Sequence, residues 1–312
     1  MPVLVEVVRS GWVESTHTGS VLAVRADGTV ALALGDVTTP VFPRSSNKPL
    51  QAVGMLVLGW DPADDELALA TASHSGEEQH LEVVRRTLAS AGLPESALAC
   101  PPSLPLHEPS AHALLARGEH ATPLTMNCSG KHAAMLATCA LHGWPTDGYL
   151  APDHPLQAAL VAAVERQAGE RVEHVAVDGC GAPQHALTLT GLARAFGRLA
   201  SGDGDAQART AAAMRAHPGL VGGTDRDVTQ LMEHVPGLVA KDGAEAVFAA
   251  GLPDGSAVAV KIADGGGRGR TPVLVAGLRA LGVTDLDRWA SSPVLGGGRP
   301  VGEARLSAAL AG

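Results

Sequence analysis

The sequence has few aromatic residues and few basic ones. Phe, Trp and Tyr make up only 3% of its 312 residues although 46% are hydrophobic, so the core must consist mainly of Ala, Val and Leu. Asp and Glu outnumber Lys and Arg by 32 to 23, which gives a formal net charge of −9. Basic residues form no run longer than pairs such as Arg85-Arg86. We therefore expect no nucleic-acid partner.

Long apolar runs are also missing. The first twelve residues, MPVLVEVVRSGW, carry Glu6 and Arg9 inside their apolar stretch, which is typical of a strand and not of a secretory signal peptide. No segment approaches the ~18 to 20 uninterrupted apolar residues of a membrane span. We expect a cytoplasmic protein without a membrane partner.

Cysteine and lysine are scarce. Four cysteines without a Cys-x-x-Cys pair are too few for a disulfide scaffold, and their simplest interpretation is as small buried hydrophobes. The four lysines each lie in a turn rich in Gly, Ser or Asp, or at the end of a predicted strand, which indicates a use other than solubility. They are Lys48, Lys131, Lys241 and Lys261.

The hydrophobic pattern changes from strands to helices and back. Residues 2–42 alternate as a β-meander, and the pattern from about residue 45 is helical, as in 77–92. Strands return at 237–243 and in a hairpin around Asp254-Gly255, and helices are expected from about 271 to the end. In between, we expect helices near 130–142, 154–168, 186–198, 206–216 and 224–233, and one strand at 172–179.

This order predicts an α+β fold in a single catalytic unit spanning residues 1–312. Strands from about 1–44 and 236–312 would share one antiparallel sheet, and residues 45–235 would form a mostly helical lobe. A site would lie between the two lobes.

The segment PRSSNKPLQA, residues 43–52, places Ser45 one helical turn before Lys48. A neutral lysine amine there could take the proton of a serine hydroxyl. Pro49 restricts the turn to the start of the helix, where N–H groups without helical partners can bind an oxyanion. The commoner meaning of the spacing is an N-cap serine followed by a solvated lysine. Periodicity does not rank Ser45 against Ser46.

Two further serines stand close together in TASHSGEEQH, where Ser73, His74 and Ser75 form a turn before a helix. Ser75 is either an ordinary helix cap or a second hydroxyl of the site. Among the arginines, Arg226 is expected on a solvated face or on a substrate carboxylate, and Arg268 and Arg270 are further candidates for that carboxylate.

A metal site is a second possibility. In TMNCSGKHAAML, Cys128, Lys131 and His132 would share one helical face, and Cys180 lies between two glycines in VDGCGAPQH. Two such cysteines with His132 as the conventional third ligand would bind zinc. The alternative is two buried thiols.

Together these motifs resemble the asparaginase II family, the rhizobial-type L-asparaginases, which share the serine β-lactamase and glutaminase-like fold. The similar stretches lie in the family's order over nearly the whole chain. They are ESTHTGS, RSSNKPLQA, ASHSGE, MNCSGKHAAML, DGCGAP, GLVGGTDRDVTQLM and VKIADGGGRGR.

The resemblance implies a homodimeric enzyme that hydrolyses L-asparagine to aspartate and ammonia with two serine-lysine pairs beside a zinc ion. It selects Ser45 over Ser46, and Lys131 as the third metal ligand in place of His132. The implied catalytic residues are Ser45, Lys48, Ser75 and Lys261; the metal ligands are Cys128, Lys131 and Cys180; and the candidate substrate-binding residues are Arg44, His74, Asn127 and Asp178.

Three alternatives remain at this point. A glutaminase, a β-lactam hydrolase or a peptidase would also use the Ser-x-x-Lys motif, but SDN and KTG triplets are absent and the only tyrosine, Tyr149, lies outside the motifs. A non-catalytic amino-acid-binding protein could keep the fold. A zinc hydrolase could use Cys128, Cys180 and His132 with a metal-bound water.

Overall fold

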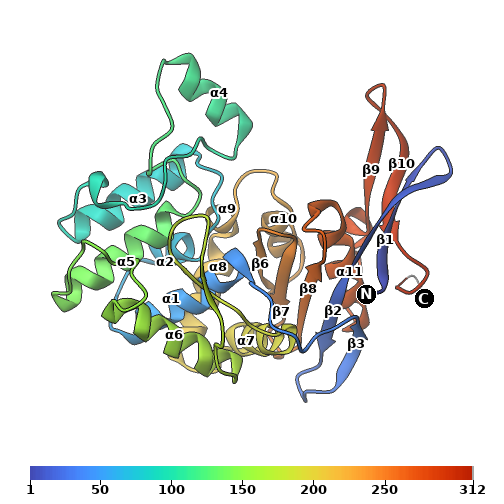
Figure 1. The fold of residues 1–312 in the computed structure, drawn as a ribbon, viewed down its shortest axis with the longest axis horizontal. Helices are drawn as coiled ribbons and strands as arrows, with labels where there is room; N and C mark the ends of the chain where they lie inside the picture. Colours follow the sequence, from blue (N-terminus) through green and yellow to red (C-terminus); the bar gives the residue numbers. More distant parts are fainter. Residues whose placement is uncertain (311–312) are drawn as a thin grey trace.

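The computed structural model describes residues 1–310. One antiparallel sheet of eight strands has the order β6-β7-β8-β2-β1-β10-β9, with β3 paired to β2 (Figure 1). Strand β1 lies between β2 and β10, with Val7 opposite Ala304, so the two ends of the chain meet in this sheet. The strands are β1 (Val3–Arg9), β2 (Trp12–Val24), β3 (Val30–Leu34), β6 (Val239–Gly243), β7 (Val247–Gly251), β8 (Ala257–Ile262), β9 (Ser291–Gly296) and β10 (Arg299–Leu306).

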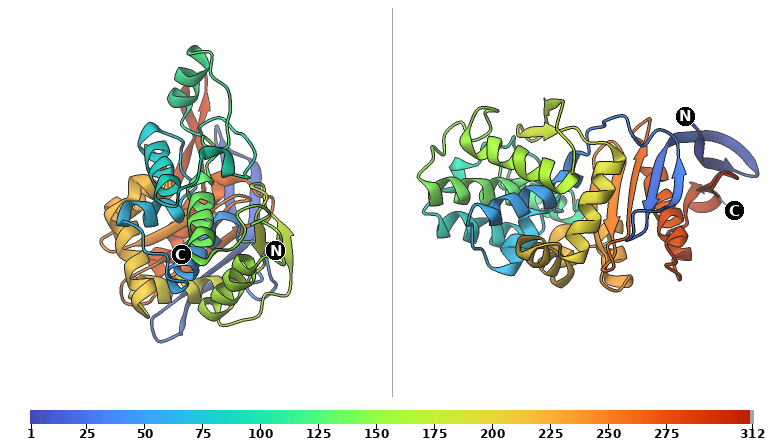
Figure 2. Two further views of the ribbon diagram at one scale, coloured as in Figure 1. Left: turned by 90° about the vertical axis from the view of Figure 1, so that its left-hand side faces the viewer. Right: turned by 90° about the horizontal axis from the view of Figure 1, so that it is seen from below.

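Most helices lie to one side of this sheet, as Figure 2 shows. A hairpin of β4 (Val175–Val177) and β5 (Pro183–His185) forms a separate two-stranded sheet. The helices are α1 (Lys48–Val57), α2 (Asp64–Ala70), α3 (Glu78–Ser90), α4 (Glu108–Ala116), α5 (Ser129–His142), α6 (Pro155–Ala168), α7 (Leu189–Ser201), α8 (Asp205–Ala216), α9 (Pro218–Val221), α10 (Asp227–His234) and α11 (Arg270–Ala280), with short 3-10 turns η1 (Arg44–Asn47), η2 (Glu95–Ala97), η3 (Gly267–Gly269) and η4 (Asp287–Trp289).

Helices α7 and α11 cover opposite faces of the sheet. Successive residues of a strand point to opposite faces. Ala257 of β8 belongs to the apolar cluster of α7, and the next residue, Val258, packs against Gly277 of α11. A side-chain carbon at Gly277 would lie 2.4 Å from Val258, so the absence of a side chain there allows this close approach. The central strands are therefore buried on both sides.

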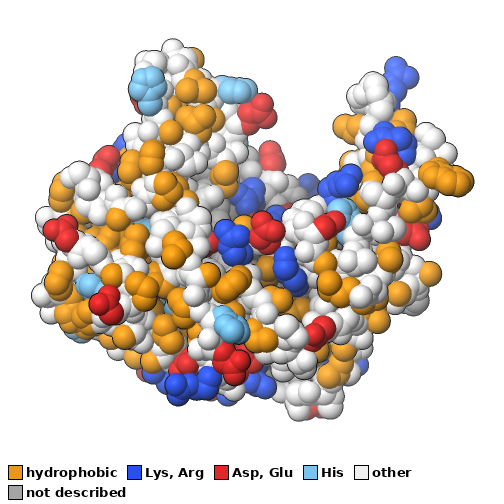
Figure 3. Space-filling model, in the orientation of Figure 1, with side chains coloured by type: hydrophobic (Ala, Val, Ile, Leu, Met, Phe, Trp, Pro, Cys, Tyr) orange, Lys and Arg blue, Asp and Glu red, His pale blue; other side chains and the backbone are white. Residues whose placement is uncertain are grey.

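The molecular surface has a hollow (Figure 3). One wall of the hollow is the projection that carries α4, and the other is the β9–β10 hairpin. Lys and Arg side chains gather in this hollow. None of the helices in residues 1–310 is long and apolar enough to cross a membrane.

The expected mixture of strands and helices is confirmed, with an antiparallel sheet, but the end of the chain was predicted wrongly. After α11 the chain forms a β-hairpin where helices were expected. Gly297 and Gly298 both have positive φ, 57° and 75°, as a tight hairpin turn requires, and β10 then pairs with β1. The C-terminal segment is rich in Ala and Leu, which favour helices, so its composition did not indicate this strand pairing. Residues 311 and 312, part of the expected sheet lobe, lie outside the described residues.

Candidate active site

Ser45 lies in the short turn η1, which leads into α1. The residue before it, Arg44, has φ of 53°, in the left-handed region that non-glycine residues rarely adopt. The Arg44 guanidinium donates to Asp178 Oδ1 at 2.7 Å, an ion pair that ties this backbone conformation to the β4–β5 hairpin. Gly243, the last residue of β6, packs against the same turn, since a side-chain carbon there would lie 2.4 Å from the Pro43 carbonyl oxygen. The turn is thus fixed from both sides.

The two neighbouring serines of this turn differ in their contacts. Ser46 is buried, and its hydroxyl donates to the Lys241 carbonyl at 2.9 Å. Ser45 is partly exposed, and its hydroxyl makes no hydrogen bond within residues 1–310. Of the two, Ser45 has the hydroxyl that is available for a reaction.

Lys48 is the first residue of α1 and is only 1% exposed. Its Nζ donates to the Ala72 carbonyl, to Ser73 Oγ at 3.1 Å and to Cys128 Sγ at 3.1 Å. These acceptors satisfy all three donors of an ammonium group, so none is directed at Ser45. The Ser-x-x-Lys spacing places both residues in one turn, but the lysine hydrogen-bonds to Ser73.

The second pair expected from the resemblance is not hydrogen-bonded. Ser75 Oγ donates to the Gly222 carbonyl at 3.1 Å, and Lys261 Nζ donates to the Glu245 carbonyl at 2.5 Å. Lys261 is partly exposed. Ser73, two residues before Ser75, is the serine that contacts a buried lysine.

Lys241 of β6 is a further lysine at the site, and sequence reasoning gave it no role. It is fully buried, and its Nζ donates to Asp242 Oδ1 at 2.6 Å. Burial lowers its pKa to about 8, helped by the charges of Lys48 and Arg226 and opposed by Asp242. An unperturbed lysine has a pKa of ~10.4, so Lys241 is close to the range in which a lysine acts as a base.

Asp242 collects three cations. Besides Lys241, Arg226 donates to Asp242 at 2.7 Å and Arg270 lies 3.2 Å from the same oxygen. Arg270 also donates to Asp227 at 3.1 Å. Both arginines therefore bind carboxylates of the protein, and neither expectation for Arg226, a solvated face or a substrate carboxylate, describes its position.

His74 is buried inside the protein. Its Nδ1 accepts the Gly76 N–H, so its Nε2 carries the proton and donates to Ser129 Oγ at 2.9 Å. Burial, with nearby His80 and Lys48, lowers the pKa of His74 well below its ordinary value, so the ring is neutral. Both nitrogens are occupied, which leaves His74 a role in fixing the turn before α3.

The Cys128 and Cys180 thiols are neighbours beside Lys48. Lys131 Nζ donates to Cys180 Sγ at 3.2 Å, and Cys128 donates to Asn127 Oδ1 at 2.9 Å. Cys128 and then Lys131 lower the pKa of Cys180, while the same contact with Cys180 and burial raise the pKa of Cys128. These opposite shifts favour the thiolate form at Cys180 over the thiolate form at Cys128.

The positions of Cys128, Cys180 and Lys131 can be compared with the expected zinc site. No group of three or more His, Cys, Asp or Glu in residues 1–310 is placed to hold a metal ion, so the conventional set of Cys128, Cys180 and His132 does not form. His132 Nδ1 lies 2.6 Å from the Tyr149 hydroxyl, and the same ring contacts Cys180 and helps to lower the pKa of that thiol. Two thiols and the Lys131 amine converge, and this donor set fits a zinc ion with a lysine as the third ligand.

The sequence from residue 5 to residue 306 matches a known protein family, L-asparaginase II. The chain belongs to the L-asparaginase II family. No curated protein matches the chain.

Among solved structures, the family member is similar to crystal structures of a protein called Mglu. Its native form shares 14% identity with a TM-score of 0.44, over 84% of this chain and 63% of that one. The form with tris and glutamate also shares 14% identity, with a TM-score of 0.45, and the match covers 91% of this chain and 65% of that one. The chain thus spans less than two thirds of the length of these two structures.

Tyr149 has no catalytic position in this L-asparaginase II family member. It is 1% exposed, and its hydroxyl accepts the Ala99 N–H at 3.1 Å besides contacting His132. Burial raises the pKa of the Tyr149 hydroxyl far above its ordinary value, so this hydroxyl does not supply a base near neutral pH.

Proposed function

We propose that the protein hydrolyses the side-chain amide of L-asparagine, releasing aspartate and ammonia, with Ser45 as the nucleophile. The main support is the contrast between two adjacent serines, of which Ser45 alone has an unoccupied hydroxyl in a turn fixed by Arg44 and Gly243. The glutaminase-like fold implied by the resemblance belongs to the same proposal.

In the proposed reaction, Ser45 Oγ attacks the amide carbon while its proton passes to the Lys48 amine, which must be neutral at that moment. N–H groups at the start of α1 bind the oxyanion. The proton then goes to the leaving nitrogen, ammonia departs, and water hydrolyses the acyl-enzyme with the same base.

We assign the supporting pair to Ser73 and Lys241 in place of Ser75 and Lys261. Ser73 Oγ is hydrogen-bonded to Lys48 and can relay its proton. The positive charge of Lys48 contributes to the low pKa of Lys241. Lys261, half-buried near Arg44, remains a candidate for contact with substrate.

Arg44, Asn127 and Asp178 are the proposed substrate-binding residues, since they surround the thiol pair and the turn of Ser45. Within residues 1–310, Arg44 donates to Asp178 Oδ1 through Nε alone, so its two terminal nitrogens can bind the α-carboxylate. The second oxygen of Asp178, Oδ2, can bind the α-ammonium group. Glutamine carries the same groups with one more methylene, and it is the alternative substrate.

We further propose that Cys128, Cys180 and Lys131 hold zinc, whose positive charge would orient the substrate. Cys180→Ser should lower the zinc content measured by mass spectrometry after purification, whereas Cys139→Ser, a buried cysteine outside this group, should not. Equal zinc content in the wild type and both variants would contradict this assignment.

We also propose the homodimer that the resemblance implies. Analytical ultracentrifugation of the purified protein measures its molecular mass in solution and so tests this proposal.

Ammonia release from L-asparagine and L-glutamine tests the enzyme proposal. Ser45→Ala should lose ~10³-fold or more in kcat, while Ser46→Ala keeps most of its turnover. Isothermal titration of Ser45→Ala with asparagine separates lost chemistry from lost binding. If the wild type binds asparagine without releasing ammonia, the protein is a binding protein and the enzyme proposal is wrong. Full activity in Ser45→Ala would contradict the assignment of Ser45 as the nucleophile.

A further inference from the structure

A cavity of about 510 Å³ lies outside the proposed asparaginase site, beside the start of α11 and the base of β9. Figure 1 shows α11 next to the β9–β10 hairpin, and the cavity is lined by residues of both, among them Thr271 of α11 and Pro293 of β9. Its charged lining residues are three arginines and one aspartate. They are Arg268, Arg270, Arg288 and Asp227.

Two of these arginines are uncommitted. Arg268 and Arg288 are exposed and make neither an ion pair nor a side-chain hydrogen bond within residues 1–310. Arg288 lies over the Trp289 ring at 5.3 Å, which fixes its stem. Arg270 is already neutralised by Asp227 and by Asp242. The cavity therefore keeps an excess of two positive charges.

Hydroxyl groups complete the lining. Ser291 and Ser292 of β9 line the cavity, and neither hydroxyl is hydrogen-bonded within the described residues. Since successive residues of a strand point to opposite faces, one of the two hydroxyls faces the cavity and the other residue contributes its backbone. Gly267, in the 3-10 turn that leads into α11, lines it as well, so that backbone N–H groups and the positive end of an 11-residue helix lie beside the arginines. Guanidinium forks with hydroxyl and N–H donors suit an oxyanion that carries two negative charges.

We propose that this cavity binds a small molecule through a phosphate group, either free phosphate or a phosphate monoester. Two uncommitted guanidinium groups balance the charge of a phosphate dianion, and each can donate two parallel hydrogen bonds to its oxygens. A monocarboxylate would leave one arginine without a partner. None of the proposed catalytic or substrate-binding residues lines this cavity, although its Arg270 contacts Asp242, the partner of Lys241, so the inference goes beyond the proposed function.

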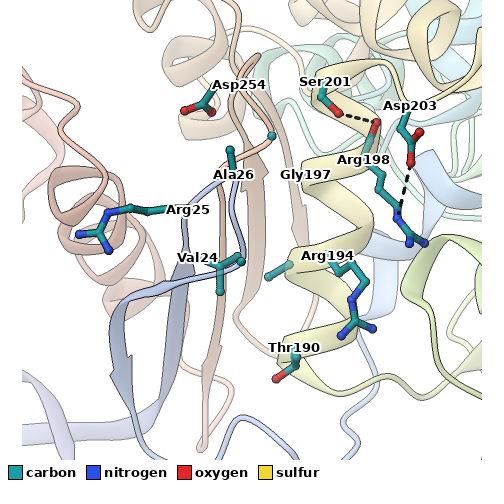
Figure 4. A pocket seen from close by; sticks show the side chains of 13 residues that line it. Val24, Arg25, Ala26, Thr190, Arg194, Gly197, Arg198, Ser201, Asp203 and Asp254 are labelled. Atoms are coloured by element: carbon teal, nitrogen blue, oxygen red, sulfur yellow. Dashed lines mark hydrogen bonds and ion pairs between the residues drawn. The ribbon is translucent and has the colours of Figure 1, made fainter.

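A second cavity shows by contrast what a poor anion site looks like. It has a volume of about 470 Å³ between β2, α7 and the β7–β8 turn, and it also has arginines in its lining. In Figure 4, Arg25 extends to one side and Arg194 and Arg198 to the other. The last two donate to backbone carbonyls at the end of α6, so they do not converge on a common ligand.

Isothermal titration with inorganic phosphate and with glycerol 3-phosphate, at constant ionic strength set with chloride, tests the proposal. The double variant with Arg268→Ala and Arg288→Ala should bind both compounds at least ~10-fold more weakly, because both charged contacts are removed. Arg25→Ala/Arg299→Ala removes two exposed arginines elsewhere and should bind as the wild type does. Tighter binding of the ester than of phosphate would identify a phosphorylated metabolite, and the reverse order would identify free phosphate.

No binding of either compound would overturn the proposal, and so would equal losses in the two double variants, which would indicate only general charge attraction. Circular dichroism of both variants checks that they are folded. The titration contains no asparagine, so its result is independent of whether the protein is an asparaginase.

Discussion

Three lysine side chains are buried, and each buried amine faces particular acceptors. Lys48 contacts Ser73 and Cys128, Lys131 contacts Cys180, and Lys241 contacts Asp242. Burying an amine is costly unless such partners compensate for the lost water. Protein stability alone does not account for three such groups close to the same turn, whereas the proposed proton transfer at a serine would account for them.

Arg226→Gln should shift the pH dependence of turnover upward. Burial lowers the pKa of Lys241 to about 8, with smaller contributions from the charges of Lys48 and Arg226 and against the opposing effect of Asp242. Removing the Arg226 charge therefore raises this pKa, and the amine stays protonated up to a higher pH. If neutral Lys241 is required, the rising limb of kcat/KM against pH moves up by a few tenths of a unit to about one unit. Arg85→Gln, on exposed α3, is the matched control. A limb that stays in place or moves down would remove Lys241 from the mechanism.

Ser73→Ala and Ser75→Ala separate the two neighbouring serines. Ser73 is hydrogen-bonded to Lys48, so its loss should reduce kcat by ~10²-fold or more if it relays a proton. Ser75 donates only to a backbone carbonyl, and its loss should cost about 1 kcal/mol of stability with kcat nearly unchanged. Ammonia release and thermal unfolding of both variants measure these effects. The opposite order would restore Ser75 to the catalytic pair.

Sequence reasoning reached part of this site. The Ser-x-x-Lys spacing identified Ser45 and Lys48 as a candidate pair, and the glycine-flanked cysteines indicated a cluster that the structure assembles. It did not separate Ser73 from Ser75, because residues two positions apart share the same motif. It also gave Lys241 no role, because burial and the contact with Asp242 arise only when β6 packs against η1.

At the scale of elements, the end of β6 and the turn η1 must approach closely for the site to form. Gly243 makes this possible, since a side-chain carbon would lie 2.4 Å from the Pro43 carbonyl. Gly251, at the end of β7, makes a similar approach to the Phe196 carbonyl, at 2.3 Å. The two glycines pose the same steric problem at different places, and only Gly243 lies beside Ser45.

Gly243→Ala and Gly251→Ala should therefore destabilise the protein similarly, by ~1 to 3 kcal/mol each. Only Gly243→Ala should also reduce kcat, by ~10²-fold, because it displaces the turn that carries the nucleophile. Chemical denaturation gives the first quantity, and ammonia release by folded protein gives the second. Equal kcat values in both variants would mean that η1 tolerates the displacement.

Elements with strong periodicity were the easiest to predict. The expected helices at 77–92, 130–142 and 154–168 correspond to α3, α5 and α6, each within a few residues. The β9–β10 hairpin was missed because its pairing with β1 joins segments almost 300 residues apart, which no local pattern contains. Helix α4 was missed as well; it has two buried residues and therefore little apolar periodicity.

At the scale of the whole molecule, the site takes residues from both the helices and the sheet. Ser45, Lys48 and Ser73 precede or begin helices, and Lys241 comes from β6. Helix α7 joins the two parts, since Phe196 is fully buried in a cluster with Val247 of β7. Activity should therefore require the same packing that stabilises the fold.

Phe196→Ala tests this dependence away from the chemistry. Losing the buried ring should lower the free energy of unfolding by ~3 to 5 kcal/mol, while kcat per folded molecule stays unchanged. In urea, ammonia release and far-UV circular dichroism should fall together in wild type and variant, with both midpoints lower in the variant. Leu141→Ala, at an exposed position on α5, should change stability by no more than ~0.5 kcal/mol. If activity disappears at a lower urea concentration than the dichroism signal, the sheet and the helices separate before either of them unfolds. In that case Lys241 leaves the site while the secondary structure remains.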